Sequence, residues 1–530
     1  MGFLRNGYQH IRPMQTKTYP LDQIKGFGKL LKNYLAGDSA LKSLYGNAPT
    51  LASFQSQIDS KKSVNRSLLV DVLTDQYQGL SNIPNINSLA DPNTFTVTTG
   101  HQLNLFTGPL YVIFKIVSTI NLARQLKKAY PKYNFVPVYW MASEDHDWDE
   151  INHLHLFGKK IQWDTEQKGP VGRFDISGLS SVWSELPSDI PVFKESYTDA
   201  KNLADAVRKY MHALFGQEGL VCLDADDARL KSSFIPVMEA DMLANKHLAC
   251  VNASNDILTN LGYSPQIYAR EINFFYMLDG MRERIEKQGD EYKVLNQSIR
   301  FSAASLQAEI KAHPERFSPN VALRPLYQET ILPNLAYLGG AAELAYWFQL
   351  KGIFDLHQTP FPILLPRNFG IIIPPLEAAR LEKLELSIPD IFQDERSLRQ
   401  QFVDMHTKHA LDLGSEQERL SNLMSKIAQK AQAIDETLEA SVLAEETRWQ
   451  KGLERLTKKM RKAEERNQAV GLGQIQAIKN KLFPEGNWQE RHTNFLEFYL
   501  NYPNLLVDLL AVLDPLQFEL FVMYLPEQDA

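Results

Sequence analysis

Two apolar segments separated by a helix pattern constrain the fold of this chain more than any other feature of its sequence. Residues 94–99 (TFTVTT) and 135–141 (FVPVYWM) are typical of buried strands, and apolar residues recur about every 3.6 positions from residue 110 onward. Pro109 suits the first turn of that helix, and Lys127 and Lys128 suit its last turn. Strand, helix and strand in this order indicate a parallel sheet covered on both faces. We therefore predict an α/β fold with a Rossmann-like, doubly wound parallel sheet.

Further strand candidates and long intervening segments indicate that this core is interrupted. Residues 219–223 (GLVCL) and 361–365 (FPILL) are short apolar runs, each followed closely by charged residues. The segments between the core pieces are too long for simple loops and should form inserted subdomains. We expect a helical N-terminal segment at 1–90, core segments at 91–157, 201–279 and 326–380, insertions at 158–200 and 280–325, a helical coiled-coil domain at 381–500 and a C-terminal helical return at 501–530.

The C-terminal part has a different periodicity. From Leu420 to Ala463, apolar residues are spaced by threes, fours and sevens, which predicts a long coiled helix. The four-residue step from Leu438 to Val442 resembles a stutter in the heptad. An antiparallel return within the chain and pairing with a second copy both remain open.

Composition excludes several classes of partner. Lys plus Arg total 56 and Asp plus Glu total 63, so a net charge of -7 gives no general attraction to nucleic acid or to an anionic membrane. The most apolar stretch, 505–513, is far shorter than the roughly 20 residues that span a bilayer. Two cysteines without a CxxC pair argue against a disulfide framework or a thiolate zinc site, and the first 20 residues lack the layout of a secretory signal. We expect a cytoplasmic protein.

The segment between the first strand and its helix is the first candidate site. Residues 99–109 (TGHQLNLFTGP) stand where α/β proteins bind ligands, and free backbone N–H groups there favour an anion. An ordinary turn is the alternative. His101 could exchange a proton near neutral pH, although a lone loop histidine is usually structural. The candidate binding residues are Gly100, Gln102, Asn104, Thr107, Gly108 and Pro109, with Lys115 two turns into the helix.

An acidic cluster follows the second strand. Glu144, Asp145, Asp147 and two further carboxylates surround His146, and such a group would repel unless solvated, paired, or bound to a cation or amine. We expect catalytic residues here, with Asn152 and His153 as binding residues. A solvated loop and a divalent-metal site that includes His155 are the alternatives.

Two more constellations occur later in the chain. Asp224 and Asp226 follow the run 219–223 and could hold a ribose or an amine, although helix capping by Asp226 or Asp227 is the slightly favoured alternative. Farther on, a glycine pair opens a helix whose amides could meet a carboxylate or phosphate, and arginines could fork onto the same group, or form structural ion pairs. These candidates are Arg324, Gly339, Gly340, Glu343, Tyr346 and Arg367.

At these residues the chain resembles the bacillithiol-synthesis cysteine ligase family, BshC. The resemblance implies a core similar to class I nucleotidylyl-transferases and aminoacyl-tRNA synthetases, with inserted subdomains and a C-terminal coiled coil that forms a homodimer. The matching segments are TTGHQLNLFTGPLY (98–111), VPVYWMASEDHDWDEINH (136–153), LVCLDADD (220–227), GYSPQIY (262–268), SPNVALRPLYQE (318–329), LAYLGGAAELAYW (335–347) and LFPEGNWQER (482–491).

The resemblance also implies an activity. The family joins the carboxyl group of cysteine to the amine of glucosaminyl malate, and because a carboxylate does not acylate an amine unaided, the synthetase-like core suggests adenylation by ATP. A second nucleotide site, for ATP or ADP, is expected near the coil, between Lys481 and Arg491. We expect no metal site of the protein itself, and Mg²⁺ would enter only with the nucleotide.

These observations combine into one hypothesis. The turn at 107–109, with Gly100 and Gln102 and assisted by Arg324 and Arg367, would cradle a phosphate or the malate carboxylates. Glu144, Asp145 and Asp147 would hold the cysteine ammonium or the attacking amine, and His146 or His101 would move the released proton. A metal-dependent hydrolase built on His146, His153 and His155, or a non-catalytic metabolite-binding coiled-coil scaffold, are the competing interpretations.

Overall fold

A computed structural model describes residues 13–527 of the chain, so positions 1–12 of the expected N-terminal segment and 528–530 of the expected return lie outside the described part. The chain separates into two compact units. The first comprises residues up to 373 together with those from 488 onward, and the second comprises residues 374–487. The helical unit is therefore inserted into the first unit, and it ends before the predicted boundary at residue 500.

A five-stranded parallel sheet forms the centre of the first unit. Its strand order is β13-β12-β2-β3-β6, and every neighbouring pair is parallel. The chain lays down β2, β3 and β6 toward one side and then returns to add β12 and β13 on the other, which confirms the predicted doubly wound sheet. The strands are β2 (Thr94–His101), β3 (Asn134–Met141), β6 (Val221–Asp224), β12 (Asn334–Gly339) and β13 (Ile363–Pro366).

The predicted helix between the first two strands is α4 (Tyr111–Ala129). Every residue from Val112 to Ala123 is buried, because strands lie on one side of the helix and α24 (Leu505–Val512) packs on another. Leu122 of this helix joins Val97, Leu335 and Phe54 in one apolar core. The strand β12 was not predicted, although it pairs directly with β2.

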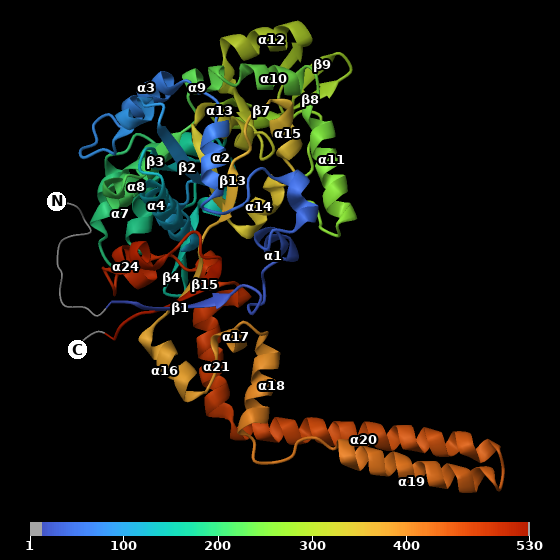
Figure 1. Cartoon of the computed structure of the whole chain (residues 1–530). Coiled ribbons are helices and arrows are strands. Elements are labelled where there is room, and N and C mark those ends of the chain that lie inside the picture. Colours follow the sequence, from blue (N-terminus) through green and yellow to red (C-terminus); the bar gives the residue numbers. More distant parts are fainter. Residues whose placement is uncertain (1–12, 528–530) are drawn as a thin grey trace. The chain divides into compact units, whose positions relative to one another are not determined.

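Further helices surround the sheet of the first unit (Figure 1). Those not named elsewhere are α1 (Lys29–Leu35), α2 (Ser53–Ser60), α3 (Arg66–Gln76), α5 (Trp148–Ile151), α6 (Ser180–Trp183), α7 (Pro191–Thr198), α8 (Leu203–Phe215), α9 (Ala228–Ser232), α10 (Ile235–Met242), α11 (His247–Asn260), α12 (Ala303–Ala312), α13 (Arg324–Ile331), α14 (Ala341–Trp347), α15 (Lys351–Leu356), α22 (Gln489–His492) and α23 (Leu496–Tyr499).

A second, antiparallel sheet is built almost entirely from the segment predicted as the later insertion. Its order is β10-β9-β8-β7-β11, and Asp279 and Gly280 form the two-residue turn between β7 and β8, with φ 73° at Gly280. A hairpin of β4 (His153–Leu156) and β5 (Lys159–Gln162) spans the predicted boundary between the first core segment and the earlier insertion. The strands of the sheet are β7 (Phe274–Leu278), β8 (Met281–Gln288), β9 (Glu291–Val294), β10 (Arg300–Ser302) and β11 (Phe317–Pro319).

A three-stranded sheet joins distant parts of the chain. β15 (Glu519–Tyr524) lies between β1 (Gln15–Pro20), which runs antiparallel to it, and β14 (Phe369–Ile373), which runs parallel to it. The segments 1–90 and 501–530 were predicted to be helical, and both predictions are wrong in part, because each contributes a strand to this sheet.

The second unit is helical. The predicted coiled helix from Leu420 consists of two helices, α19 (Gly414–Gln432) and α20 (Thr437–Asn467), because the chain turns at residues 433–436. The antiparallel return that the sequence left open is therefore present. The short turn sends α20 back along α19 as an antiparallel hairpin, and Ser421 bonds to Glu446 across it (Figure 1). Pairing with a second copy stays a prediction. The other helices are α16 (Pro375–Lys383), α17 (Ile388–Ile391), α18 (Glu395–His406) and α21 (Ala469–Leu482).

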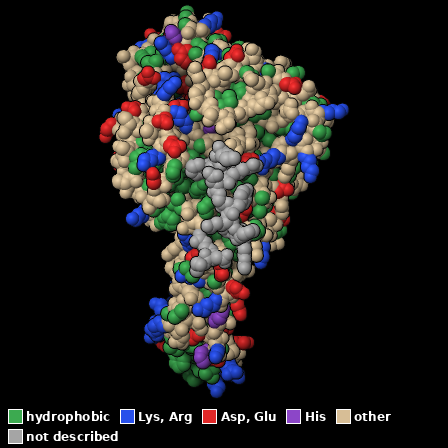
Figure 2. Space-filling view, turned by 90° about the vertical axis from the view of Figure 1, so that its left-hand side faces the viewer, with side chains coloured by type: hydrophobic (Ala, Val, Ile, Leu, Met, Phe, Trp, Pro, Cys, Tyr) green, Lys and Arg blue, Asp and Glu red, His purple; other side chains and the backbone are tan. Residues whose placement is uncertain are grey.

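The surface shows no large field of one charge on the face drawn in Figure 2, where Lys and Arg side chains alternate with Asp and Glu. Within residues 13–527, no helix combines the length and the apolar character needed to cross a membrane.

Candidate functional site

A large cavity lies at the carboxyl ends of β2, β3 and β12. Its volume is about 1140 Å³, and its wall includes Gly100 of β2, Met141 of β3 and Gly340 just beyond β12. β2 and β12 are the neighbours between which the winding of the sheet reverses, which is where doubly wound proteins bind their ligands. Residues of the second sheet, among them Phe275 and Arg282, complete the wall.

The cavity brings together many of the predicted residues and leaves others out. Those on its wall are Gly100, His101, Gln102, Lys115, Glu144, Asp145, His146, Arg324, Gly340, Glu343, Tyr346, Arg367 and Arg491. Those away from it are Asn104, Thr107, Gly108, Pro109, Asp147, Asn152, His153, Asp224, Asp226 and Gly339, and Lys481 belongs to the second unit.

Two carboxylates of the acidic loop face the cavity together. The Gln102 side chain donates to Asp145 Oδ2 and to Glu150 Oε2, each at 2.8 Å. Burial tends to raise the pKa of Asp145, but hydrogen bonds from the His146 backbone N–H and from Gln102, together with the charge of Arg282, outweigh it, so that this pKa lies well below its usual value. Asp145 is therefore an anion at neutral pH, suited to holding a substrate ammonium group.

An ion pair between a buried lysine and a partly exposed glutamate lies on the cavity wall. Lys115 Nζ lies 2.7 Å from Glu343 Oε2 and donates to the carbonyl of Gly100, also at 2.7 Å. Burial lowers the pKa of Lys115, whereas the nearby Lys115 charge more than offsets burial for Glu343, whose pKa is lowered. Glu343 also accepts the backbone N–H of Gly340. The lysine thus fixes the end of β2 against the start of α14, rather than extending freely toward a ligand.

His101 is a poor candidate for a base. Burial, followed by the charge of Lys115, lowers its pKa to about 3, so its ring is neutral and holds a proton weakly near pH 7. Its Nε2 atom lies 3.1 Å from the Tyr111 hydroxyl. The prediction that His101 could move the released proton is therefore not supported by its surroundings.

The two predicted arginines differ. Arg367 is buried and already forks onto Glu490, with contacts of 2.9 and 2.5 Å, so its predicted assistance to an anion is replaced by a structural ion pair. Arg324 lies between the rings of Trp140 and Tyr337, and its Nη1 donates to Gln328 at 3.1 Å. Within the described residues its buried Nη2 atom has no hydrogen-bond partner. A buried unpartnered donor on a cavity wall fits an anionic oxygen.

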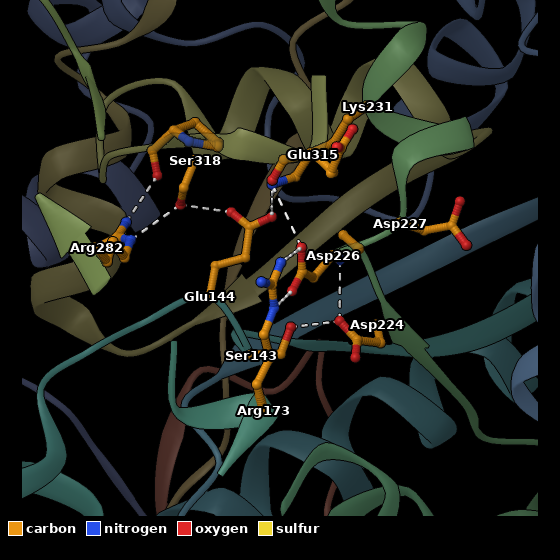
Figure 3. A network of polar contacts seen from close by, with 12 residues as sticks. Ser143, Glu144, Arg173, Asp224, Asp226, Asp227, Lys231, Arg282, Glu315 and Ser318 are labelled. Atoms are coloured by element: carbon orange, nitrogen blue, oxygen red, sulfur yellow. Dashed lines mark hydrogen bonds and ion pairs between the residues drawn. The ribbon is translucent and has the colours of Figure 1, made fainter. Parts of the chain in front are cut away.

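Glu144 faces a cluster of buried charges rather than an open position for an amine. Its carboxylate lies 2.6 Å from Lys231 Nζ and accepts the Ser318 hydroxyl at 2.7 Å. Burial raises its pKa, and the charge of Lys231 opposes that rise. Figure 3 shows this network continuing through Lys231 to Asp226 and Arg173. The ammonium group of Lys231 therefore occupies the position on Glu144 that we predicted for a substrate amine.

The same network accounts for the third constellation. Asp226 accepts two hydrogen bonds from Arg173, at 2.9 and 3.1 Å, and Asp224 accepts the Ser143 hydroxyl and the backbone N–H of Asp226. Burial and the neighbouring Asp226 charge raise the pKa of Asp224. Both carboxylates are committed to protein partners, so the predicted binding of a ribose or amine is not supported.

The predicted anion cradle at 107–109 is wrong. Asn104 and Thr107 are buried, and Asn494 donates to the carbonyls of Phe106 and Gly108 at 2.8 and 2.6 Å. Protein thus fills the place that a ligand would take. Gly108 has φ 66°, and a side chain there would collide with Asn104, so this glycine is required by the turn itself.

The histidines of the metal-site alternative are not gathered. His146 lines the cavity, whereas His153 bonds to Asn152 at the start of β4 and its ring packs against His155. Asp147 is exposed at the start of α5 and does not line the cavity. Among residues 13–527, no group of three or more His, Cys, Asp or Glu side chains is arranged to hold a metal ion.

Some cavity residues had no signal in the sequence. Arg282 and Phe275 come from the second sheet. Lys231, which does not line the cavity but pairs with Glu144, comes from α9, a helix that carries no recognisable motif. The Asp279–Gly280 turn could have predicted the hairpin β7–β8. Its docking against the loop after β3 could not have been predicted, because no local pattern encodes that contact.

Comparison with known proteins gives one family over almost the whole chain. Residues 14–368 match the family described as "Bacillithiol biosynthesis BshC, N-terminal Rossmann-like domain", and residues 370–525 match its C-terminal coiled-coil domain. A relative from Cytophaga hutchinsonii is 41% identical over 94% of this chain and 97% of its own length. One from Flavobacterium johnsoniae is 43% identical, with 91% and 94% covered. Both carry the provisional name cysteine ligase BshC. The chain therefore belongs to the BshC family of bacillithiol biosynthesis proteins.

Proposed function

We propose that this protein is a ligase that joins the carboxyl group of cysteine to the amine of glucosaminyl malate, forming an amide, with ATP supplying the activation. The curated relatives named as cysteine ligases support the class of reaction. The observation that carries the proposal is the mixed charge of one cavity. One part of its wall holds the carboxylates of Asp145 and Glu150, and another holds Arg324, whose Nη2 atom has no hydrogen-bond partner among the described residues.

These charges match the proposed substrates. Cysteine and glucosaminyl malate each carry an amine, and both also carry carboxylates. Asp145, ionised at neutral pH and held in place by Gln102, would bind an ammonium group. Arg324 would bind a carboxylate through its free Nη2 atom. Holding both reactants in one enclosed space lowers the entropic cost of bringing them together.

The cavity residues also fit a nucleotide. Bound ATP would supply the activation that a carboxylate needs before an amine can displace its oxygen. The Arg324 Nη2 donor fits a phosphate oxygen as well as a carboxylate oxygen, and Trp140 and Tyr337 fix its guanidinium between their rings. The second nucleotide site that we expect near Arg491 remains a prediction, and no contact described here supports it.

The test supplies purified protein with cysteine, ATP and glucosaminyl malate and follows the amide product by mass spectrometry, with omission of each component in turn. We expect product only when all three are present. Arg324→Gln should lower kcat/KM about 30-fold, because an anion would lose a charged partner worth about 2 kcal/mol.

Arg300→Gln is the matched control, because Arg300 is an exposed arginine of β10 that pairs with Glu291 at 3.2 Å and lies off the cavity. It should retain wild-type kinetics. No product from the wild-type protein would refute the proposal, and equal kinetics of the two variants would remove Arg324 from it.

A further inference from the structure

We propose that Arg282 is a positioning residue that holds His146 as the neutral tautomer with its proton on Nε2. His146 then offers the cavity a hydrogen-bond donor and does not accept the proton released by the amine. The assignment of the tautomer depends only on the geometry around His146. The role of His146 in amide formation rests on the proposed function.

Arg282 is fixed on three sides. Its Nε donates to Ser318 Oγ at 3.0 Å, its Nη2 donates to the carbonyl of Pro319 at 3.3 Å, and its guanidinium lies 3.9 Å from the centre of the Phe275 ring. Ser318 in turn donates to Glu144 at 2.7 Å, as Figure 3 shows. Because the β11 partners and the ring fix the guanidinium, the remaining Nη1 atom is aimed in one direction.

That direction is the His146 ring. Arg282 Nη1 lies 2.9 Å from His146 Nδ1. A guanidinium can only donate, since it keeps its protons at any pH a folded protein experiences. Nδ1 must therefore carry the lone pair, and the single proton of the neutral ring is on Nε2. A second proton on Nδ1 would place two cationic donors against each other at hydrogen-bond distance.

The other groups around His146 agree with this assignment. Asp145 Oδ1 lies 3.6 Å from Nδ1, beyond a hydrogen bond, and that oxygen accepts the backbone N–H of His146 at 2.7 Å instead. Phe275 of β7 packs against the ring with a centre-to-centre distance of 5.6 Å. The charged groups facing the ring are thus Asp145 from its own loop and Arg282 from β8. Within the described residues Nε2 has no protein partner, and the side chain is 46% exposed, on the cavity wall.

A fixed N–H on the wall suits an oxygen that becomes negative. When an amine attacks an activated acyl group, charge develops on the acyl oxygen, and a donor already aimed at it stabilises that charge. The contribution of His146 is a hydrogen bond only, and no proton moves to or from its ring.

Two substitutions separate a donor from a base. His146→Gln places an amide N–H about where Nε2 stands, but an amide cannot take up a proton. His146→Ala removes both possibilities. We expect the Gln variant to keep kcat within about 10-fold of wild type and the Ala variant to lose about 100-fold, as when one oxyanion donor is removed. Equal losses in both variants would overturn the assigned role.

The tautomer is measured without turnover. Long-range proton–nitrogen NMR of ¹⁵N-histidine protein, with His146→Gln to assign the signal, reports which ring nitrogen carries the proton. We expect Nε2 protonated and Nδ1 bare near pH 7 in wild type. In Arg282→Gln the ring should populate both tautomers, because the fixed donor that faces Nδ1 is gone.

Arg284→Gln is the matched control, with the same charge change on the same strand and no contact to His146. It should leave the tautomer as in wild type. A proton on Nδ1 in wild type, or an unchanged ring in Arg282→Gln, would overturn the inference. If the NMR result holds while no amide is made, the proposed function fails and the positioning by Arg282 stands.

Discussion

The loops after β3 and β6 look alike in sequence and differ in what faces them. Each follows a buried strand and carries clustered carboxylates, at 144–150 and at 224–227. In the first loop Asp145 meets the neutral amide of Gln102 and a cavity. In the second, Asp226 meets the guanidinium of Arg173, with Lys231 Nζ 3.7 Å away. The difference teaches that a carboxylate stays accessible to a ligand where its side-chain hydrogen-bond partner is a neutral amide rather than a cation.

Glu144 marks the boundary between the two arrangements. It belongs to the first loop, but its charge is balanced by Lys231, the same cation that serves Asp226. Because Lys231 of α9 pairs with Glu144, this first carboxylate of the loop has a structural role. This difference between the two loops can be tested by removing the cation that faces the second loop and the carboxylate that faces the cavity in the first.

The largest effect is expected from Lys231→Met. Lys231 is fully buried, and its loss leaves Glu144 without its cation and Asp226 with Arg173 alone, so the free energy of unfolding should fall by about 4 kcal/mol. Urea unfolding measures this. Lys209→Met is the control, because its partner Asp205 is partly exposed, and it should cost less than about 1 kcal/mol. Similar costs for the two variants would contradict the structural role of the second loop.

Asp145→Asn should act on catalysis. Loss of a charge that holds a substrate amine costs about 3 kcal/mol, which lowers kcat/KM about 100-fold in the ligase assay. Asp147→Asn changes the same charge two residues away, at an exposed position off the cavity, and should stay within about 3-fold of wild type. If Asp147→Asn lowered kcat/KM as much as Asp145→Asn does, the specific role of Asp145 would be contradicted, and the charge of the whole loop would matter instead.

The smallest effect concerns the pH dependence of stability. The pKa of Asp224 is raised in the folded protein, so its contribution is present below about pH 4 and is lost as pH rises. Asp224→Asn keeps the uncharged form, and its free energy of unfolding should improve relative to wild type from pH 4 to pH 7. The pKa of Asp145 is lowered in the folded protein, so its contribution is present above about pH 4 and is lost as pH falls. The deficit of Asp145→Asn relative to wild type should therefore shrink as pH is lowered below about 4. Urea midpoints at several pH values check both signs, and parallel curves would contradict them.

The sequence predicted the parts of the fold that local patterns encode. β2, α4 and β3 follow from β-branched runs and a 3.6-residue period, and residues of the loops after both strands line the cavity. β12 was missed, because six residues that end in a glycine give no period long enough to recognise. The break in the coil was missed because the heptad spacing continues across the turn at 433–436.

The candidate site was harder to predict, because pairing depends on distant partners. Arg367 and Glu490 are 123 positions apart, and no sequence pattern around either residue predicts their ion pair. Asn494 closes the turn at 106–108 from 386 positions away. Sequence motifs therefore located the edge of the sheet, whereas only the folded chain separates the charges left for a ligand from those already neutralised.

The strand order β1-β15-β14 has a consequence for folding during synthesis. β14 and β15 are parallel neighbours, and the crossover between them contains the whole helical unit, so the central strand of this sheet is synthesised long after both of its neighbours. Long-range pairings of this kind form slowly. On the ribosome, β1 and β14 would wait with open edges while the hairpin α19–α20 is already able to fold, and the first unit would close only when residues 519–524 emerge.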